Sequence, residues 1–302
     1  MLNLFPEIGR QARRLKPSRC VISYATDQAL IPALRLLVEQ GLITEPIFLA
    51  PRKLDGMKLF RKVSSMRDSA IMAHECRKNQ EAELIIQGHE KRQPFISLHL
   101  DGGMLEPQAV YVAAFYDVRR RQTFFGIDPL VALAPTLENH IMRLNVVGPF
   151  MRHLLKRRIQ AAALAPIETV NPKLPATISA AVLAQMSVRQ QFGNFLEVSG
   201  PLDIDCALSK VAAQRKGVES KNSGSFDSYI FPDTNSAYFF ATFLKYIGKV
   251  PTIGVLLSAD RHLLLNSTPL TVSERVAEIT LGLIANNFYK KTKQRGGYDS
   301  GN

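Results

Sequence analysis

Short runs of apolar, β-branched residues alternate with longer amphipathic segments along this sequence, and no other feature constrains its fold as strongly. The run CVISYA at residues 20–25 has the composition of a buried strand. Residues 27–40 then carry apolar side chains at helical spacing, and PIFLAP at 46–51 has the composition of a second strand. Because strand, helix and strand in succession form a parallel pair with a helical crossover, the start of the chain predicts an α/β fold.

The same alternation continues to the C-terminal part of the chain. Further strands are expected at 83–88, 110–116, 123–127, 161–165, 194–198, 228–232 and 252–257. Further helices are expected at 68–79, 136–156, 179–186, 203–215, 235–246 and 272–287. The polar connector Asp117–Arg121 predicts a hairpin between the strands that flank it. The pattern predicts a mostly parallel sheet with helices on both faces, in which ligands bind beyond the carboxyl ends of the strands.

Charge and cysteine content restrict the partners and the compartment. The 302 residues have a formal net charge of +12, which favours anionic partners, either phosphate-bearing small molecules or nucleic acid. The basic clusters are not interleaved with aromatic residues, so nucleic acid is the weaker alternative. No run approaches the roughly 18 apolar residues of a membrane span. Three widely spaced cysteines predict neither a disulfide framework nor a zinc site, which favours a reducing cytoplasm.

Three loop motifs are candidates for ligand binding. The sequence lacks the glycine-rich fingerprints of dinucleotide and P-loop sites. The run NPKLP at 171–175 presents Lys173 between two prolines, either as an anion ligand or as part of a rigid connector. Ser199-Gly200-Pro201 predicts a tight turn that exposes backbone N–H groups, or a turn without a ligand. Asp233 follows a strand, where it orients a donor or caps the next helix.

Taken together, five stretches of the second half are typical of one enzyme family. They are residues 167–187, 199–212, 216–220, 228–233 and 246–259. Their order and spacing resemble the phosphate acetyltransferase/phosphate butyryltransferase family. The resemblance extends over about residues 18–288, and the chain is identified as a divergent member.

This resemblance implies a fold, a reaction and an assembly. The fold is a two-domain, three-layer α/β/α architecture like that of the isocitrate/isopropylmalate dehydrogenases. One domain would comprise residues 1–100 and 260–302 and the other residues 101–259, with the site in the cleft between them. The implied protein is a cytoplasmic homodimer. It would reversibly transfer a short acyl group between coenzyme A and inorganic phosphate, with coenzyme A as a substrate and no metal or redox cofactor.

Several positions depart from the family pattern where the chemistry is expected. Ser267 is retained, but Thr268 stands where an arginine is expected and Leu270 where an aspartate is expected. A threonine cannot supply the bidentate grip of a guanidinium on phosphate. Other altered positions are Gln87, Lys91, Arg92, Ser97, Cys206, Ser225, Ala237 and Tyr238.

Two hypotheses follow for the site. In the first, the chain is an acyltransferase with a rebuilt site; in the second, it binds coenzyme A or phosphate ligands without turnover. The expected catalytic residues are Ser267, as a polar contact at the reacting centre, and Asp205. The expected substrate-binding residues are Asn171, Lys173, Ser199, Gly200 and Asp233, with Lys91 and Arg92 as replacement cations.

Overall fold

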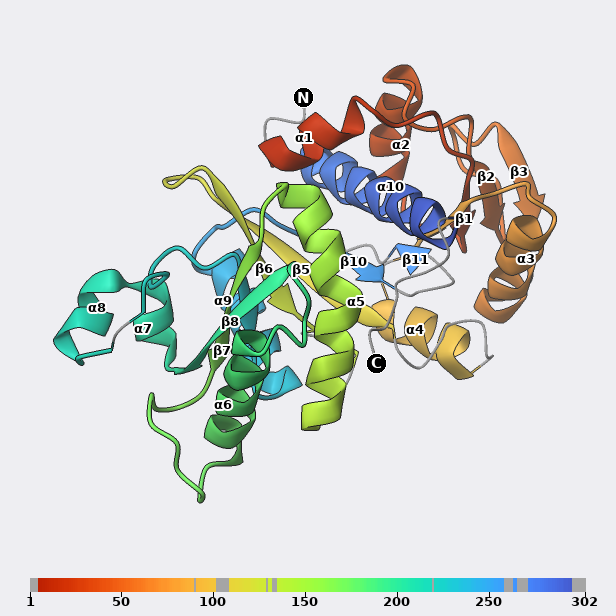
Figure 1. The fold of residues 1–302 in the computed structure, drawn as a ribbon. Helices are drawn as coiled ribbons and strands as arrows, with labels where there is room; N and C mark the ends of the chain where they lie inside the picture. Colours follow the sequence, from red (N-terminus) through yellow and green to blue (C-terminus); the bar gives the residue numbers. More distant parts are fainter. Residues whose placement is uncertain are drawn as a thin grey trace. The chain divides into compact units, whose positions relative to one another are not determined.

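The chain folds into two compact units, one made of residues 1–109 and 253–302 and the other of residues 110–252. The structure, a computed structural model, describes residues 5–89, 91–101, 109–128, 130–131, 135–218, 220–257, 263–264 and 271–294 (Figure 1). Within these ranges, no helix is long and apolar enough to cross a membrane. The expected domains and the cleft between them stay a prediction.

The first unit contains a mostly parallel sheet. Its strand order is β3 (Leu59–Lys62), β2 (Ile47–Ala50), β1 (Cys20–Ser23), β4 (Leu84–Gln87), β11 (Leu263–Leu264) and β10 (Thr252–Leu257). All neighbouring pairs are parallel except β10 with β11. The parallel pairing of β1 with β2 confirms the strand–helix–strand start predicted from the sequence.

Helices cover both faces of this first sheet. They are α1 (Pro6–Ala12), α2 (Leu30–Glu39), α3 (Met66–Lys78), α4 (Arg92–Asp101) and α10 (Val272–Gln294). Helices α1, α2 and α10 gather on one side of the strands and α3 on the other (Figure 1). The N-cap of α2 is Ala29, and Asp27 accepts a hydrogen bond from the Ala29 N–H at 2.9 Å, so Asp27 lies before the cap position. Gly41 follows α2 with a φ of +66°, as a helix C-terminus favours.

The second unit contains its own mixed sheet. The strand order is β5 (Val110–Asp117), β6 (Gln122–Ile127), β9 (Ser228–Ile230), β7 (Ile159–Leu164) and β8 (Leu196–Leu202). Strands β5 and β6 form the predicted antiparallel hairpin, and β6, β9, β7 and β8 are parallel. The helices are α5 (Leu137–Leu155), α6 (Pro175–Val188), α7 (Ile204–Leu208), α8 (Lys210–Arg215) and α9 (Thr234–Tyr246). Thr136, the first residue of the helix predicted at 136–156, caps α5 by accepting from the Asn139 N–H at 3.3 Å.

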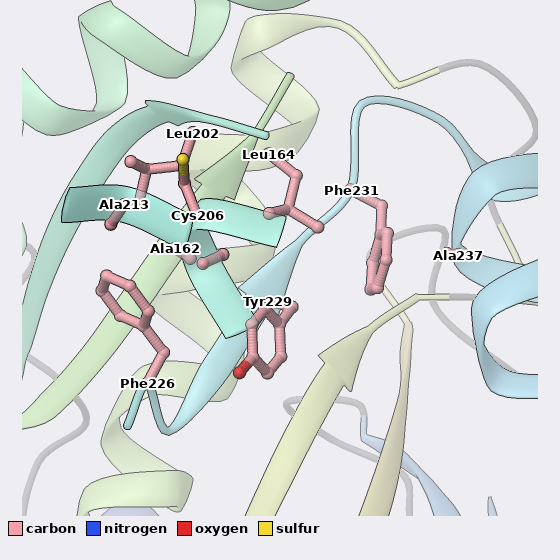
Figure 2. Close-up of a cluster of buried hydrophobic side chains, with 10 residues drawn as sticks. Ala162, Leu164, Leu202, Cys206, Ala213, Phe226, Tyr229, Phe231 and Ala237 are labelled. Carbon is pink, nitrogen blue, oxygen red and sulfur yellow. The ribbon is translucent and has the colours of Figure 1, made fainter. Parts of the chain in front are cut away.

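The side chains of β7 alternate between the two faces of this sheet. Ala162 and Leu164 belong to a buried cluster with residues of α7, α8 and α9 (Figure 2). Ala163, between them, faces the opposite side and lines a pocket with residues of α6. Figure 2 shows that the aromatic rings of Phe226 and Tyr229 fill the space beside the small side chain of Ala162.

Three local predictions for this unit are wrong. Ser199-Gly200-Pro201 lies inside β8 and is not a turn, and Ser199 pairs with Ala162 of β7. The single helix expected at 203–215 is two helices, because Ser209 has extended backbone angles and caps α8 through its hydroxyl group. Helix α6 begins at Pro175, which fits the first turn of a helix, and not at Ser179.

Candidate functional site

A pocket of about 260 Å³ opens at the carboxyl ends of β7 and β9 in the second unit. Because these strands are parallel, their carboxyl ends meet at one edge of the sheet, where ligands of α/β folds bind. Its lining residues come from these strand ends and from the starts of α5, α6 and α9: Pro135, His140, Ala163, Leu164, Pro175, Ala176, Ser179, Ala180, Leu183, Ile230, Phe231, Pro232 and Asp233.

The start of α6 gives this pocket a site for negative charge. The side chains of Thr136 and Asp233 cap α5 and α9, respectively. The N-cap residue of α6, Leu174, offers no capping side chain. Pro175 has no N–H group, and the Thr177 N–H donates to the Leu174 carbonyl at 2.9 Å. The remaining N–H groups of the first turn of α6 and the positive end of its dipole suit a ligand such as a phosphate or a carboxylate.

His140 is the buried polar side chain of the pocket wall. Burial, and then the positive charge of Arg143, lower the pKa of His140. A hydrogen bond to the Pro232 carbonyl opposes both effects, and the resulting pKa is about 4. Arg143 itself pairs with Asp128 at 3.1 Å, and both side chains are buried. His140 is therefore neutral near pH 7, donating to Pro232 through one ring nitrogen and keeping the other as an acceptor.

A second polar cluster lies at the carboxyl ends of β7 and β8. The Nζ of Lys216 donates to Glu168 at 3.0 Å, to Asp205 at 2.9 Å and to Asp203. The hydrogen bond from Lys216 lowers the pKa of Glu168 to about 2. The hydrogen bonds that Lys216 donates to these carboxylates raise the pKa of Lys216 in turn. The cluster is thus a network of one cation and three anions at the start of α7.

Cys206 lies beside this network, and its thiol is not an activated nucleophile. Its Sγ donates to Glu168 at 3.3 Å. Burial and the neighbouring carboxylates raise the pKa of Cys206. Ligand atoms of Glu168, Asp203, Asp205 and Cys206 lie within 4.8 Å of one another, as metal ligands do. The Lys216 ammonium already donates to all three carboxylates and so takes the cation position that a metal ion would occupy.

The predicted residues Asn171 and Lys173 lie on the loop that leads into α6. The Asn171 side chain accepts from the Lys173 N–H at 2.9 Å, and the Asn171 N–H donates to Thr177 at 2.9 Å. Thr177 is fully buried, so it anchors this loop. Lys173 is exposed, close in sequence to the uncapped start of α6. Asn171 therefore shapes the approach to the pocket but does not line it.

The other predicted residues of the second unit have separate surroundings. Asp233 lines the pocket and caps α9 by accepting from the Ser236 N–H at 2.8 Å. Asp205 belongs to the Lys216 network. Gly200 lies against β7, where an added Cβ would stand 2.7 Å from the Ala163 carbonyl oxygen. Close strand packing therefore requires glycine at this position.

Two predicted cations of the first unit follow strand β4. Lys91 is exposed. Burial, and then the charge of Lys91, lowers the pKa of His89. Arg92 is the first residue of α4. The predicted catalytic residue Ser267 lies outside the described residues, as do Thr268 and Leu270.

The sequence hypothesis did not include His140 or Lys216. Lys216 begins the KGVES stretch, but its charge alone did not indicate three carboxylate partners. His140 lies one helical turn after the Thr136 cap. This spacing places His140 near the start of α5, but it does not indicate that the side chain lines a pocket.

Comparisons with known proteins show relatives along most of the chain. The chain is 28% identical to the phosphate acetyltransferase of Rickettsia prowazekii (strain Madrid E), covering 94% of this chain and 84% of that protein. It is 26% identical to the probable phosphate butyryltransferase of Bacillus subtilis (strain 168), covering 91% of this chain and 95% of that protein. Both relatives are therefore similar to this chain over most of its length.

Solved structures show the same fold. The structure of a branched-chain phosphotransacylase from Enterococcus faecalis V583 matches with a TM-score of 0.73 at 17% identity, covering 89% of this chain and 99% of that one. A phosphotransacetylase from Streptococcus pyogenes matches with a TM-score of 0.69 at 14% identity, covering 95% and 99%. These likenesses confirm the predicted two-domain α/β fold class.

Residues 43–261 match the family described as phosphate acetyl/butaryl transferase. This range includes most of the first unit's parallel strands and the whole pocket edge of the second unit. The chain belongs to the phosphate acetyl/butyryl transferase family.

Proposed function

We propose that this protein is a phosphate acyltransferase, which reversibly transfers a short acyl group between coenzyme A and inorganic phosphate. Family membership across residues 43–261 carries this proposal. The pocket supports it, because the uncapped start of α6 and the neutral His140 suit a ligand that combines negative charge with polar groups. Acyl-CoA and phosphate are the substrates, and coenzyme A and an acyl phosphate are the products.

The reaction needs two anionic substrates close together and stabilisation of one charged centre. An oxygen of phosphate forms a bond to the thioester carbonyl carbon, the C–S bond breaks, and the coenzyme A sulfur leaves as a thiolate that takes a proton. Fixed hydrogen-bond donors near the carbonyl oxygen stabilise the tetrahedral centre. In this proposal, Ser267 is a polar contact at that centre, and Lys91, Arg92 and Lys173 attract the anionic substrates.

The test is phosphate-dependent release of free coenzyme A thiol from acetyl-, propionyl- and butyryl-CoA. Ser267→Ala is expected to reduce kcat by roughly 10²-fold or more, the usual cost of losing a transition-state donor. Ser64→Ala, at an exposed serine of the first unit, is the matched control and should keep full activity. Turnover without phosphate, or no turnover with any of the three thioesters, would refute the proposal. Binding of coenzyme A without turnover would instead support a noncatalytic binding protein.

We also propose that the protein is a cytoplasmic homodimer, and that the outer face of α9 forms its interface. This face exposes large apolar side chains: Tyr238 (47%), Phe239 (67%), Phe243 (63%), Tyr246 (48%) and Ile247 (69%). A contiguous apolar patch of this kind is typical of an interface. A two-fold axis would place α9 of a second copy against α9 of the first, so that the apolar faces of both helices are buried.

Light scattering coupled to size-exclusion chromatography tests the dimer. Phe243→Glu should shift the protein to a monomer, because a charge at the centre of the patch would be buried without a partner. Val188→Glu is the control, since Val188 is 73% exposed at the end of α6 and lies outside the patch. A monomeric wild type, or a dimer that survives Phe243→Glu, would contradict this interface.

A further inference from the structure

Arg275 is a buried cation whose donors are incompletely used. It lies in the first turn of α10, and its side chain is 4% exposed. Its Nη2 stands 3.0 Å from Oδ2 of Asp27, whose side chain is 6% exposed. Its Nε and Nη1 have no hydrogen-bond partner among the residues that the structure describes. A single carboxylate therefore engages one side of a guanidinium that offers further N–H groups.

Burying the Nε and Nη1 donors of Arg275 lowers the stability of the folded state unless another group accepts hydrogen bonds from them. Folded proteins satisfy the large majority of buried polar atoms, and an unsatisfied donor on a charged group is among the more expensive exceptions. Asp27 is held in place by the Ala29 N–H at 2.9 Å, so the pair has a fixed geometry. The unused donors of Arg275 thus have no acceptor among the described residues, and a bound anion would complete them.

The position of the pair in the first unit also indicates a ligand. The Asp27 N–H donates to the carbonyl of Gly88 at 2.9 Å, and Gly88 directly follows β4. Asp27 itself follows β1, which pairs with β4 in parallel. Arg275 therefore lies at the carboxyl edge of the first sheet, which is the ligand-binding edge of α/β folds. Lys91 follows β4 at the same edge and adds a second positive charge.

The second unit contains a comparable pair with a different pattern of donors. Arg143 and Asp128 are also buried and stand 3.1 Å apart. At Arg143, the nitrogen without a hydrogen bond is Nη2, the atom that faces the carboxylate. At Arg275, the atom that faces Asp27 is Nη2, and the atoms without a hydrogen bond are Nε and Nη1. The unused capacity of Arg275 is therefore on the parts of the guanidinium that do not face Asp27.

We propose that Arg275 is an anion-binding residue that takes a phosphate oxyanion through Nε or Nη1, with Asp27 as its positioning residue. This inference rests on the proposed acyl transfer, in which both substrates carry phosphate groups. In this proposal, the guanidinium of Arg275 in α10 takes the anion-binding role of the arginine that Thr268 replaces in the family pattern. The oxyanion is either inorganic phosphate or a phosphate group of coenzyme A.

Arg275→Lys tests this assignment, because lysine keeps the charge and loses the guanidinium donors. If inorganic phosphate is the ligand, the KM for phosphate should rise about ten- to a hundredfold while the KM for acyl-CoA stays within about twofold. If the ligand is a phosphate of coenzyme A, the KM for acyl-CoA should rise instead. Unchanged KM values for both substrates in a folded variant would overturn the proposal.

Binding measurements separate this inference from the acyl-transfer proposal. Inorganic phosphate and coenzyme A are titrated separately into wild type and Arg275→Lys by calorimetry, without turnover. Arg61→Lys is the control: it alters an exposed ion pair with Glu81 in the first unit and should leave both dissociation constants unchanged. Turnover in wild type with equal affinities in Arg275→Lys would refute the role of Arg275 alone. Binding that needs Arg275, in a protein without turnover, would refute the acyl transfer alone.

A wild-type measurement covers the case in which Arg275→Lys does not fold. Crystals soaked in arsenate, an analogue of phosphate with anomalous scattering, should show an arsenic peak at hydrogen-bond distance from Nε or Nη1 of Arg275. Crystals soaked in coenzyme A test the other source of the oxyanion in the same way. Oxyanion density at other positions, with none at Arg275 in either soak, would overturn the assignment.

Discussion

The Nζ of Lys216 lies 2.9 Å from Oδ1 of Asp205, a residue that the sequence pattern assigns to catalysis. The same ammonium group donates to Glu168 and Asp203. Lys216 thus connects the loop after β7 to the start of α7. Asp205 is therefore part of an ion-pair network at the edge of the sheet.

Replacing Lys216 by methionine should destabilise the second unit and lower the urea midpoint of unfolding near neutral pH. Three carboxylates would then repel one another without a cation. The difference in urea midpoint between wild type and variant should become smaller on acidification. Glu168 has a pKa of about 2 beside Lys216, but in the variant it would regain an ordinary pKa and become protonated. Lys210→Met, an exposed lysine of α8, is the control. Equal midpoints for the two variants would contradict the network.

Chelation of divalent metals should leave activity unchanged. The carboxylates that could hold an ion already share the Lys216 ammonium, which occupies the place between them. Thiol release is measured after dialysis against EDTA, with and without added Mg²⁺ or Mn²⁺. A loss of turnover that is restored by metal would show that the cluster, or another site, holds an ion.

His140 should make the folded state less stable on mild acidification. Its pKa is about 4 in the folded protein and ordinarily 6.5, so the unfolded chain binds the extra proton between these values. The contribution of His140 is fully present above about pH 6.5 and is lost as the pH falls toward 4. Urea unfolding across this range should therefore have a shallower pH dependence in His140→Gln. Identical slopes in the two proteins would contradict a buried neutral imidazole.

Gly200→Ala should destabilise the protein by about 1–3 kcal/mol, the usual cost of overpacking. The new Cβ would stand 2.7 Å from the Ala163 carbonyl oxygen and push β8 away from β7. Urea unfolding measures the loss. Ser199→Ala, at the neighbouring residue of β8, is the control for stability. If Ser199 also contacts substrate, that control should lose affinity for acyl-CoA or phosphate while its unfolding midpoint stays constant.

Lys173→Ala should weaken phosphate or coenzyme A binding several-fold, more strongly at low ionic strength. An exposed ammonium near the start of α6 attracts an anion through a charge that salt screens. Calorimetry at two salt concentrations measures the effect, with Lys249→Ala, another exposed lysine, as the control. Unchanged affinity in Lys173→Ala at low salt would remove Lys173 from the site.

Local sequence patterns predicted most elements because these depend on neighbouring residues. The apolar run at Cys20–Ser23, the capping residue Thr136 and the polar hairpin connector each act within a few residues. The predictions failed where a distant partner decides the local structure. Ser199-Gly200-Pro201 has the composition of a turn, yet it pairs along β7, because Gly200 fits against the carbonyl of Ala163.

The sequence by itself determined the α/β alternation and the family, since composition and spacing carry that information. Only the tertiary structure decided which charges meet. Lys216 reaches Glu168 across 48 residues, and Arg275 meets Asp27 from the opposite end of the chain. Parallel strands bring such residues to one edge of a sheet, where burial changes their pKa values. Burial also leaves hydrogen-bond donors of Arg275 without an acceptor among the described residues. Neither effect has a signature in the order of the residues.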